Sequence, residues 1–236
     1  MRLLVQFPTL ARPEKFLRVL DSYVSKISSW NQIFFNINCD VDDETMNDAY
    51  IRERIKYILS KRNEADGVVN YDSNTDKISA INAHIDEQSF DIVICASDDM
   101  VPKAYSWDQR IVEAMQDHFP SLDGCVHFND GNTNGDLITF SILGRKLYEY
   151  FGYIYHPDYK SLYCDDEFTQ VVKAMGKEKY IDNVIITHEH YSVEGTENHG
   201  DVDFAARKTL HYSGRDQLVF NKRKEMGFPK HRITAD

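Results

Sequence analysis

Three polar residues, Ser97, Asp98 and Asp99, follow directly after the short apolar run of residues 92–96. An uninterrupted run of this kind predicts a strand that is buried on both faces, as in a parallel sheet. Ligands of open α/β sheets bind beyond the carboxyl ends of such strands. Two adjacent carboxylates are costly there unless a cation or hydrogen bonds stabilise them. Mg²⁺ and Mn²⁺ prefer hard oxygen ligands, so a divalent cation site is one prediction, and a turn with an aspartate helix cap is the other.

Two further groups of polar side chains have types and spacing that suit chemistry. Asp165 and Asp166 precede a helical apolar pattern, where a carboxylate can act as a general base or can simply cap the helix. His188 and His190 follow the apolar residues 184–187. Residues two apart in an extended segment point to the same side, so this pair could bind a metal, although a single histidine is more commonly structural.

Composition limits the classes of function. The 236 residues suffice for one large α/β domain, and 42% hydrophobic with 28% charged residues is an ordinary globular composition. The formal charge of −11 argues against a nucleic-acid partner that would be held by the overall field of the protein. It leaves room for a small phosphate-bearing ligand, because one bound divalent cation can reverse the local field.

The cysteines and the N-terminus predict a cytoplasmic location. The four cysteines, Cys39, Cys95, Cys125 and Cys164, form no CxxC pair, so we expect buried free thiols in a reducing compartment rather than disulfides or a zinc site. Residues 1–8 are too short and too soon interrupted for a signal peptide. No segment approaches the ~20 apolar residues of a membrane span.

The apolar patterns predict a mostly parallel sheet flanked by helices. Strands are expected at residues 3–7, 33–39, 67–71 and 92–96, alternating with helices, which implies right-handed crossovers. Residues 124–128 and 137–141 should then form a hairpin that makes the sheet mixed, and residues 184–187 a last short strand. Helices are expected from Pro13, at residues 145–153 and after Asp166, and no linker or repeat divides the chain.

Four segments resemble, in order, the motifs of nucleotide-sugar glycosyltransferases of the GT-A fold, in particular the glycosyltransferase family 2 type. They are the PTLARP run at residues 8–13, the ASDD run at 96–99 (similar to a DxD motif with Ser97 in place of the first aspartate), the CDDEF run at 164–168, and Arg215-Asp216 with Phe220 and Arg223. The resemblance covers residues 3–228. It implies a single domain over residues 1–236, with a nucleotide-binding half at 1–102, an acceptor-side half at 103–203 and a basic C-terminal tail at 204–236.

The resemblance also implies the metal site and the catalytic base. Asp99 would bind Mn²⁺ or Mg²⁺, and Asp98 would reach the ribose or a metal-bound water. His190 is the first choice for a further metal ligand and His188 the second. Asp166 would be the base of an inverting transfer, with Asp165 as the alternative; either could instead cap the helix.

The donor implied by the resemblance is a nucleoside-diphosphate sugar of the UDP or GDP type, and the acceptor is a glycan or another hydroxyl compound. Residues near the carboxyl ends of the first strands would frame the base and ribose, and cationic side chains would approach the diphosphate: Pro8, Thr9, Arg12, Asp40 and Asp42 for the former, Lys77 and Arg215 for the latter. Arg223 would either reach the diphosphate or balance an acidic surface.

Two other classes of protein stay open at this point. A sugar-phosphate nucleotidylyltransferase has a related sheet but opens with a glycine-rich phosphate loop, and residues 8–13 contain no glycine. A carbohydrate-binding domain of the same fold without turnover is the second alternative.

Overall fold

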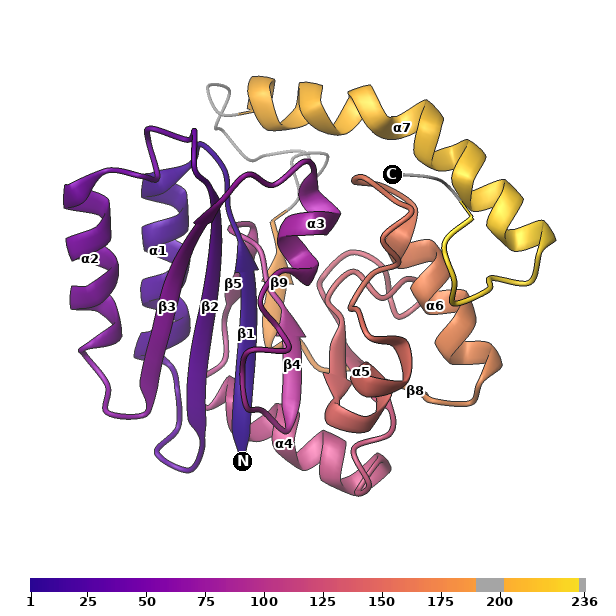
Figure 1. The fold of residues 1–236 in the computed structure, drawn as a ribbon. Helices are drawn as coiled ribbons and strands as arrows, with labels where there is room; N and C mark the ends of the chain where they lie inside the picture. The colour runs from indigo at the N-terminus through magenta and orange to yellow at the C-terminus, as the bar shows by residue number, and fades with distance from the viewer. Residues whose placement is uncertain (190–201, 234–236) are drawn as a thin grey trace.

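The computed structural model describes residues 1–189 and 202–233, and only the backbone at 202–210. A seven-stranded mixed sheet runs through the described part of the chain in the order β3-β2-β1-β4-β7-β6-β8 (Figure 1). Its strands are β1 (Arg2–Pro8), β2 (Gln32–Asp40), β3 (Ala65–Asp72), β4 (Ile92–Cys95), β6 (Cys125–Phe128), β7 (Ile142–Gly144) and β8 (Glu178–Ile181). Strand β7 is antiparallel to both of its neighbours, and the remaining pairs are parallel. The predicted mostly parallel, mixed sheet is therefore confirmed.

Helices cover both faces of the sheet. They are α1 (Pro13–Ser25), α2 (Ala49–Leu59), α3 (Lys77–Asn82), α4 (Trp107–His118), α5 (Arg145–Phe151), α6 (Cys164–Ala174) and α7 (Val202–Glu225). Alternate residues of β1 point to opposite faces: Leu3, Val5 and Phe7 pack with α1, α2 and α4, whereas Leu4 packs with α3, α5 and α6. Pro13 occupies the first turn of α1, as predicted.

Several features of the fold differ from the sequence-based prediction, among them the edge strand β8, which was not expected. The second hairpin strand is Ile142–Gly144 rather than residues 137–141, because pairing with β4 determines where the strand forms. Two short strands, β5 (Met100–Pro102) and β9 (Ile186–His188), make a separate antiparallel pair. The segment expected to be a basic tail forms α7, which lies along one end of the molecule, above α3 and α6 in Figure 1.

All four cysteines are buried free thiols, as expected. Among the described residues, no helix combines the length and the apolar character that crossing a membrane requires.

Candidate active site

The loop after β4 places Asp98 and Asp99 at the carboxyl end of the central strand. Backbone hydrogen bonds fix the loop from both sides, since Ala96 donates to the carbonyl of Gln6 and Met100 to that of Ser97. The two carboxylates then have different surroundings. Asp98 is buried against the loop that follows β1, and Asp99 lies beside β9.

Asp98 is held by two of the residues that the sequence assigned to the donor site. Its Oδ2 accepts a hydrogen bond from Thr9 Oγ1 at 3.3 Å, and its Oδ1 lies 2.9 Å from Nη2 of Arg12. The guanidinium is not aligned for a hydrogen bond, so this buried oxygen keeps its hydrogen-bonding capacity. Burial raises the pKa of Asp98 to about 6, although Arg12 opposes the shift.

Asp99 faces His188 across the β5–β9 pair. His188 Nε2 lies 3.6 Å from Asp99 Oδ1, and Ser97 Oγ donates to the same oxygen. Burial alone would raise the pKa of Asp99, but His188, Ser97 and Lys77 together hold it well below its usual range. The carboxylate is therefore ionised and ready to bind a cation.

A loop that the sequence analysis did not single out fixes the position of His188. The His188 amide donates to the carbonyl of Asp130 at 3.0 Å, and Asn132 Nδ2 donates to the carbonyl of His188 at 2.8 Å. The Asp130 carboxylate closes its own loop by accepting from Thr139 Oγ1 and from the Thr133 amide. In the sequence, only the many turn-forming residues at 129–136 mark this loop. Its contact with β9 shows that the loop positions His188.

The structure brings together part of the expected metal site. Asp99 and His188 are adjacent, whereas His190, the first choice for the histidine ligand, lies outside the described residues. Within residues 1–189 and 202–233, no cluster of three histidine, cysteine or carboxylate side chains has metal-binding geometry. One carboxylate and one imidazole would leave the remaining coordination positions to substrate oxygens, water or residues beyond those described. The Asp99 carboxylate is a ligand that suits both Mn²⁺ and Mg²⁺, so the residues present fit either ion.

A hollow lies where β1 and β2 end. It has a volume of about 330 Å³ and is lined by the loop after β1 and by the acidic loop after β2: Leu10, Ala11, Asp40, Asp42, Asp43, Glu44 and Thr45. Asp43 ties the two loops together, because its Oδ2 accepts from the Ala11 amide at 2.6 Å and its Oδ1 accepts from Thr45. Asp40 and Asp42 therefore lie in one hollow. Pro8 lies beside it, at the end of β1 opposite Asn38.

The two candidate bases occupy the first turn of α6. Burial raises the pKa of Asp166, and the neighbouring Asp165 adds to the shift. Asp165 accepts a hydrogen bond from the Asp166 amide and acts electrostatically on Cys95, at the end of β4, and on Tyr155. Its charge therefore reaches the strand that carries the Asp98–Asp99 loop.

Lys77 begins α3 and acts electrostatically on Asp99, Cys95 and Cys164. Its side chain is exposed, and the groups that its charge reaches include Cys95 at the end of β4 and Cys164 at the start of α6. Helix α3 is fixed by a capping box in which the Asp76 side chain accepts from the Ser79 amide, and by an ion pair of 2.7 Å between Asp76 and Lys160. This position allows Lys77 to meet an anionic ligand.

Arg215 and Arg223 do not belong to the candidate active site, because other protein groups bind their side chains. Arg215 donates to the carbonyl of Asp158 and to the Asp216 carboxylate. Arg223 is completely buried, with Glu167 and Asp158 as its ionic partners, so it is neither a surface charge nor exposed to a ligand. Sequence reasoning missed this because nothing in a basic C-terminal segment marks one arginine as a core residue.

Comparison with known proteins identifies the fold. The sequence matches no family model and no curated protein. Among solved structures, a mannosyltransferase, PcManGT from Pyrobaculum calidifontis in complex with GDP-Man and Mn²⁺, has a TM-score of 0.63 at 12% identity, over 92% of this chain and 64% of that one.

Two other similar structures come from bacteria. S. aureus TarS 1-349 in complex with UDP-GlcNAc has a TM-score of 0.54 at 15% identity, over 79% of this chain and 57% of that one. Glucosyl-3-phosphoglycerate synthase from Mycobacterium tuberculosis, in complex with Mg²⁺ and UDP, has a TM-score of 0.53 at 12% identity, over 80% of this chain and 72% of that one. The chain has a GT-A-type fold, and it spans less than two thirds of the length of the mannosyltransferase and of TarS.

Proposed function

We propose that the protein is a metal-dependent, inverting glycosyltransferase that moves a sugar from a nucleoside-diphosphate sugar to a hydroxyl group of an acceptor. The observation that carries the proposal is the pairing of Asp99 with His188 beyond the carboxyl end of β4. In a GT-A-type fold this is where the ends of the strands leave a ligand site. Solved structures of the same fold contain GDP-Man with Mn²⁺, or UDP with Mg²⁺.

The metal would be held by Asp99 and His188, with His190 as a further candidate ligand. A bound Mn²⁺ or Mg²⁺ would stabilise, as a Lewis acid, the negative charge that develops on the departing nucleoside diphosphate. The residues fit this task because Asp99 is held in its ionised form by its neighbours. In a protein of net charge −11, a cation would also reduce the repulsion between the site and a diphosphate.

The donor would lie over the ends of β1 and β2. The base and ribose would occupy the hollow lined by Asp40 and Asp42, whose carboxylates can accept hydrogen bonds from a base edge or from ribose hydroxyls. Asp98 would act on the ribose or on a metal-bound water, and Thr9 and Arg12 would hold its carboxylate in place. Lys77 would approach the diphosphate. Arg215 already donates hydrogen bonds to Asp158 and Asp216, so it would act only by holding the loop that contains Asp158.

The general base would come from the start of α6. Asp166 is the first choice, because its raised pKa makes it a better proton acceptor than an ordinary aspartate. Asp165 stays the alternative, since its charge acts on the end of β4. The acceptor would be a glycan or another hydroxyl compound. We place the reaction in the cytoplasm, which agrees with four cysteines that are all unpaired.

The test is turnover of a panel of UDP- and GDP-sugars with Mn²⁺, with Mg²⁺ and with EDTA. We expect hydrolysis or transfer with a divalent cation and none in EDTA. Asp99→Ala should lower the metal-stimulated rate by about 10²-fold or more, because a Lewis acid contributes several kcal/mol. Asp117→Ala, which removes an exposed carboxylate from α4, is the matched control and should leave the rate unchanged. Full activity of the wild type in EDTA would refute the proposal.

A further inference from the structure

A second cavity, of about 460 Å³, lies on the flank of the molecule formed by α5, α6 and the segment after α7. Aromatic side chains supply much of its wall: Tyr150, Phe151, Tyr153, Phe168 and Phe228. Tyr153 is stacked on Phe151 with a centroid distance of 5.8 Å and an interplanar angle of 29°. We call this cavity the aromatic pocket. Its volume lies in the range of small-molecule sites, which combine apolar walls with a few polar groups.

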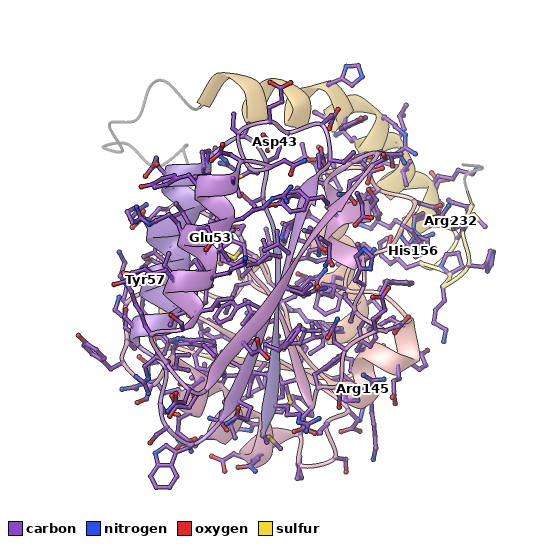
Figure 2. All side chains as sticks on the ribbon, turned by 60° about the vertical axis from the view of Figure 1, so that its left-hand side comes forward. Asp43, Glu53, Tyr57, Arg145, His156 and Arg232 are labelled. Atoms are coloured by element: carbon purple, nitrogen blue, oxygen red, sulfur yellow. The ribbon has the colours of Figure 1, made fainter. Side chains whose placement is uncertain are left out.

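The aromatic pocket has a rigid back wall. Arg223 of α7 makes two parallel hydrogen bonds to Glu167, of 2.7 and 2.8 Å, and a third of 2.9 Å to Asp158. It also donates to the carbonyl of Pro229, and His156 Nε2 lies 3.0 Å from the carbonyl of Lys230. These bonds fix the segment after α7 against α6. Figure 2 shows His156 and Arg232 on this flank, below α7.

The aromatic pocket begins at the turn that carries the proposed base. Cys164 and Glu167 line it, and Asp165 and Asp166 lie between them in the first turn of α6. The helix therefore presents the pocket on one face and the two candidate bases at its N-terminus. Asp165 and Asp166 do not line the pocket themselves, so only a ligand longer than the pocket would reach them.

Three lysines at the end of α7 and just after it, which we call the rim, lie on or next to the segment 227–230 that lines the aromatic pocket. Arg215 and Arg223 do not add to their charge, because Asp216, Glu167 and Asp158 neutralise them. Lys222, Lys224 and Lys230 are exposed, and none of them makes an ion pair with a residue in the described part of the chain. Lys230 lines the pocket, with its Nζ 3.8 Å from the centroid of the Tyr150 ring.

We propose that the aromatic pocket binds an anionic saccharide, namely the part of the acceptor that lies beyond the reacting hydroxyl group. The pyranose ring would stack on Tyr153 and Phe228, and the lysines of the rim would attract its carboxylate, sulfate or phosphate groups. The identification of this saccharide as the acceptor rests on the proposed function. The binding itself does not, and it can be measured without turnover.

The experiment begins with the whole chain on an array of neutral, carboxylated, sulfated and phosphorylated oligosaccharides, with a dodecyl glycoside as an apolar probe. The strongest anionic ligand is then titrated by calorimetry. Tyr153→Ala should weaken binding about tenfold, which corresponds to about 1.4 kcal/mol, because the ring contributes both a stacking contact and buried area. Lys230→Gln should weaken it several-fold at low salt, and this difference should shrink as salt screens the charge.

Tyr57→Ala and Lys56→Gln are the matched controls. Both side chains are exposed on α2, and Figure 2 shows Tyr57 on the outer side of that helix, on the flank opposite His156. Neither change should alter the affinity. Thermal unfolding of every variant reports on folding, and Phe228→Ala replaces Tyr153→Ala if loss of the Phe151 stack destabilises the chain.

The proposal is overturned if anionic glycans bind no better than neutral ones, if the pocket variants bind as the wild type does, or if only the dodecyl glycoside binds. UDP and GDP are titrated with Mn²⁺ in the same preparations. Saccharide binding without nucleotide binding would contradict the proposed function and leave the saccharide site standing. Nucleotide binding without saccharide binding would contradict the saccharide site and leave the proposed function standing.

Discussion

The two faces of the sheet carry different kinds of side chains where β1, β2 and β3 form it. The face under α1, α2 and α4 is apolar, and its largest side chains include Phe7, Phe35 and Trp107. The face under α3 carries buried amides instead. Asn36 donates to Gln6 at 2.7 Å, and Asn70 donates to Asn36 and to Asn38 at 2.8 and 2.9 Å.

These amides hold α3 by its backbone. Asn38 and Gln6 donate to the carbonyl of Ala80, and Gln6 and Asn36 also donate to that of Ala83. Apolar packing alone tolerates small shifts, whereas hydrogen bonds fix direction as well as distance. We infer that the apolar face stabilises the fold. The polar face fixes the position of α3, and therefore of Lys77, relative to the end of β4.

The largest expected effect comes from the buried ionic cluster that joins α7 to α6 and to Asp158. Arg223→Met leaves Glu167 and Asp158 buried without their cation, so the free energy of unfolding should fall by about 3–5 kcal/mol. Urea unfolding measures the change. Adding Glu167→Gln to Arg223→Met should recover part of the loss, since it removes one of the unpaired charges. A loss below about 1 kcal/mol in the single variant would show that the cluster is not essential to the fold.

The next prediction compares the two faces directly. Asn38→Ala should cost about 1–3 kcal/mol, because it breaks the hydrogen bonds with Ala80 and Asn70, and it should also weaken Mn²⁺-dependent nucleotide binding by loosening α3. Leu20→Ala on the apolar face should cost about 2–5 kcal/mol and leave nucleotide affinity unchanged. Unfolding and calorimetry of both variants test the comparison. Equal effects on nucleotide affinity would contradict it.

The smallest expected effect is a shift in a pH profile. Burial and the charge of Asp165 raise the pKa of Asp166, so the acid limb of the transfer rate should lie above the pKa of a free aspartate, about 3.9. Asp165→Asn removes a negative neighbour, which favours ionised Asp166, and the limb should therefore move to lower pH.

Asp166→Asn serves as the reference for this shift and should lower the transfer rate ~10²–10⁴-fold. If Asp165→Asn abolishes transfer instead, Asp165 is the base.

The same comparison explains how much could be predicted from the sequence. Apolar runs predicted β1, β2 and β4 because a strand buried on both faces, or one with a wholly apolar face, leaves a local pattern. Strand β5 was not predicted, because it has only three residues and exists through its pairing with β9, which is a long-range contact; β9 itself overlaps the short strand expected at residues 184–187. The strand expected at residues 137–141 failed for the same reason: Ile138 and Phe140 are buried, but the sheet pairs with the residues that follow.

The candidate site divides in a similar way. Motif order along the chain brought Thr9, Arg12, Asp98 and Asp99 into one hypothesis, to which His188 was added as the second choice of metal ligand after His190. The structure places Thr9 and Arg12 beside Asp98, and His188 beside Asp99. The role of Arg223 was not predictable, because its burial depends on Glu167 and Asp158, more than fifty residues earlier in the chain. Sequence patterns indicate which side chains can do chemistry, and long-range contacts decide which of them are structural.

The most direct test of the central claim is calorimetric titration of UDP and of GDP in the presence of Mn²⁺ and in the presence of EDTA. If Asp99 and His188 hold a cation that binds the diphosphate, at least one of these nucleotides should bind much more tightly with Mn²⁺, and Asp99→Ala should remove most of that gain. Asp117→Ala should retain it. Equal affinity with Mn²⁺ and with EDTA, or an undiminished Mn²⁺ effect in Asp99→Ala, would contradict the proposed site.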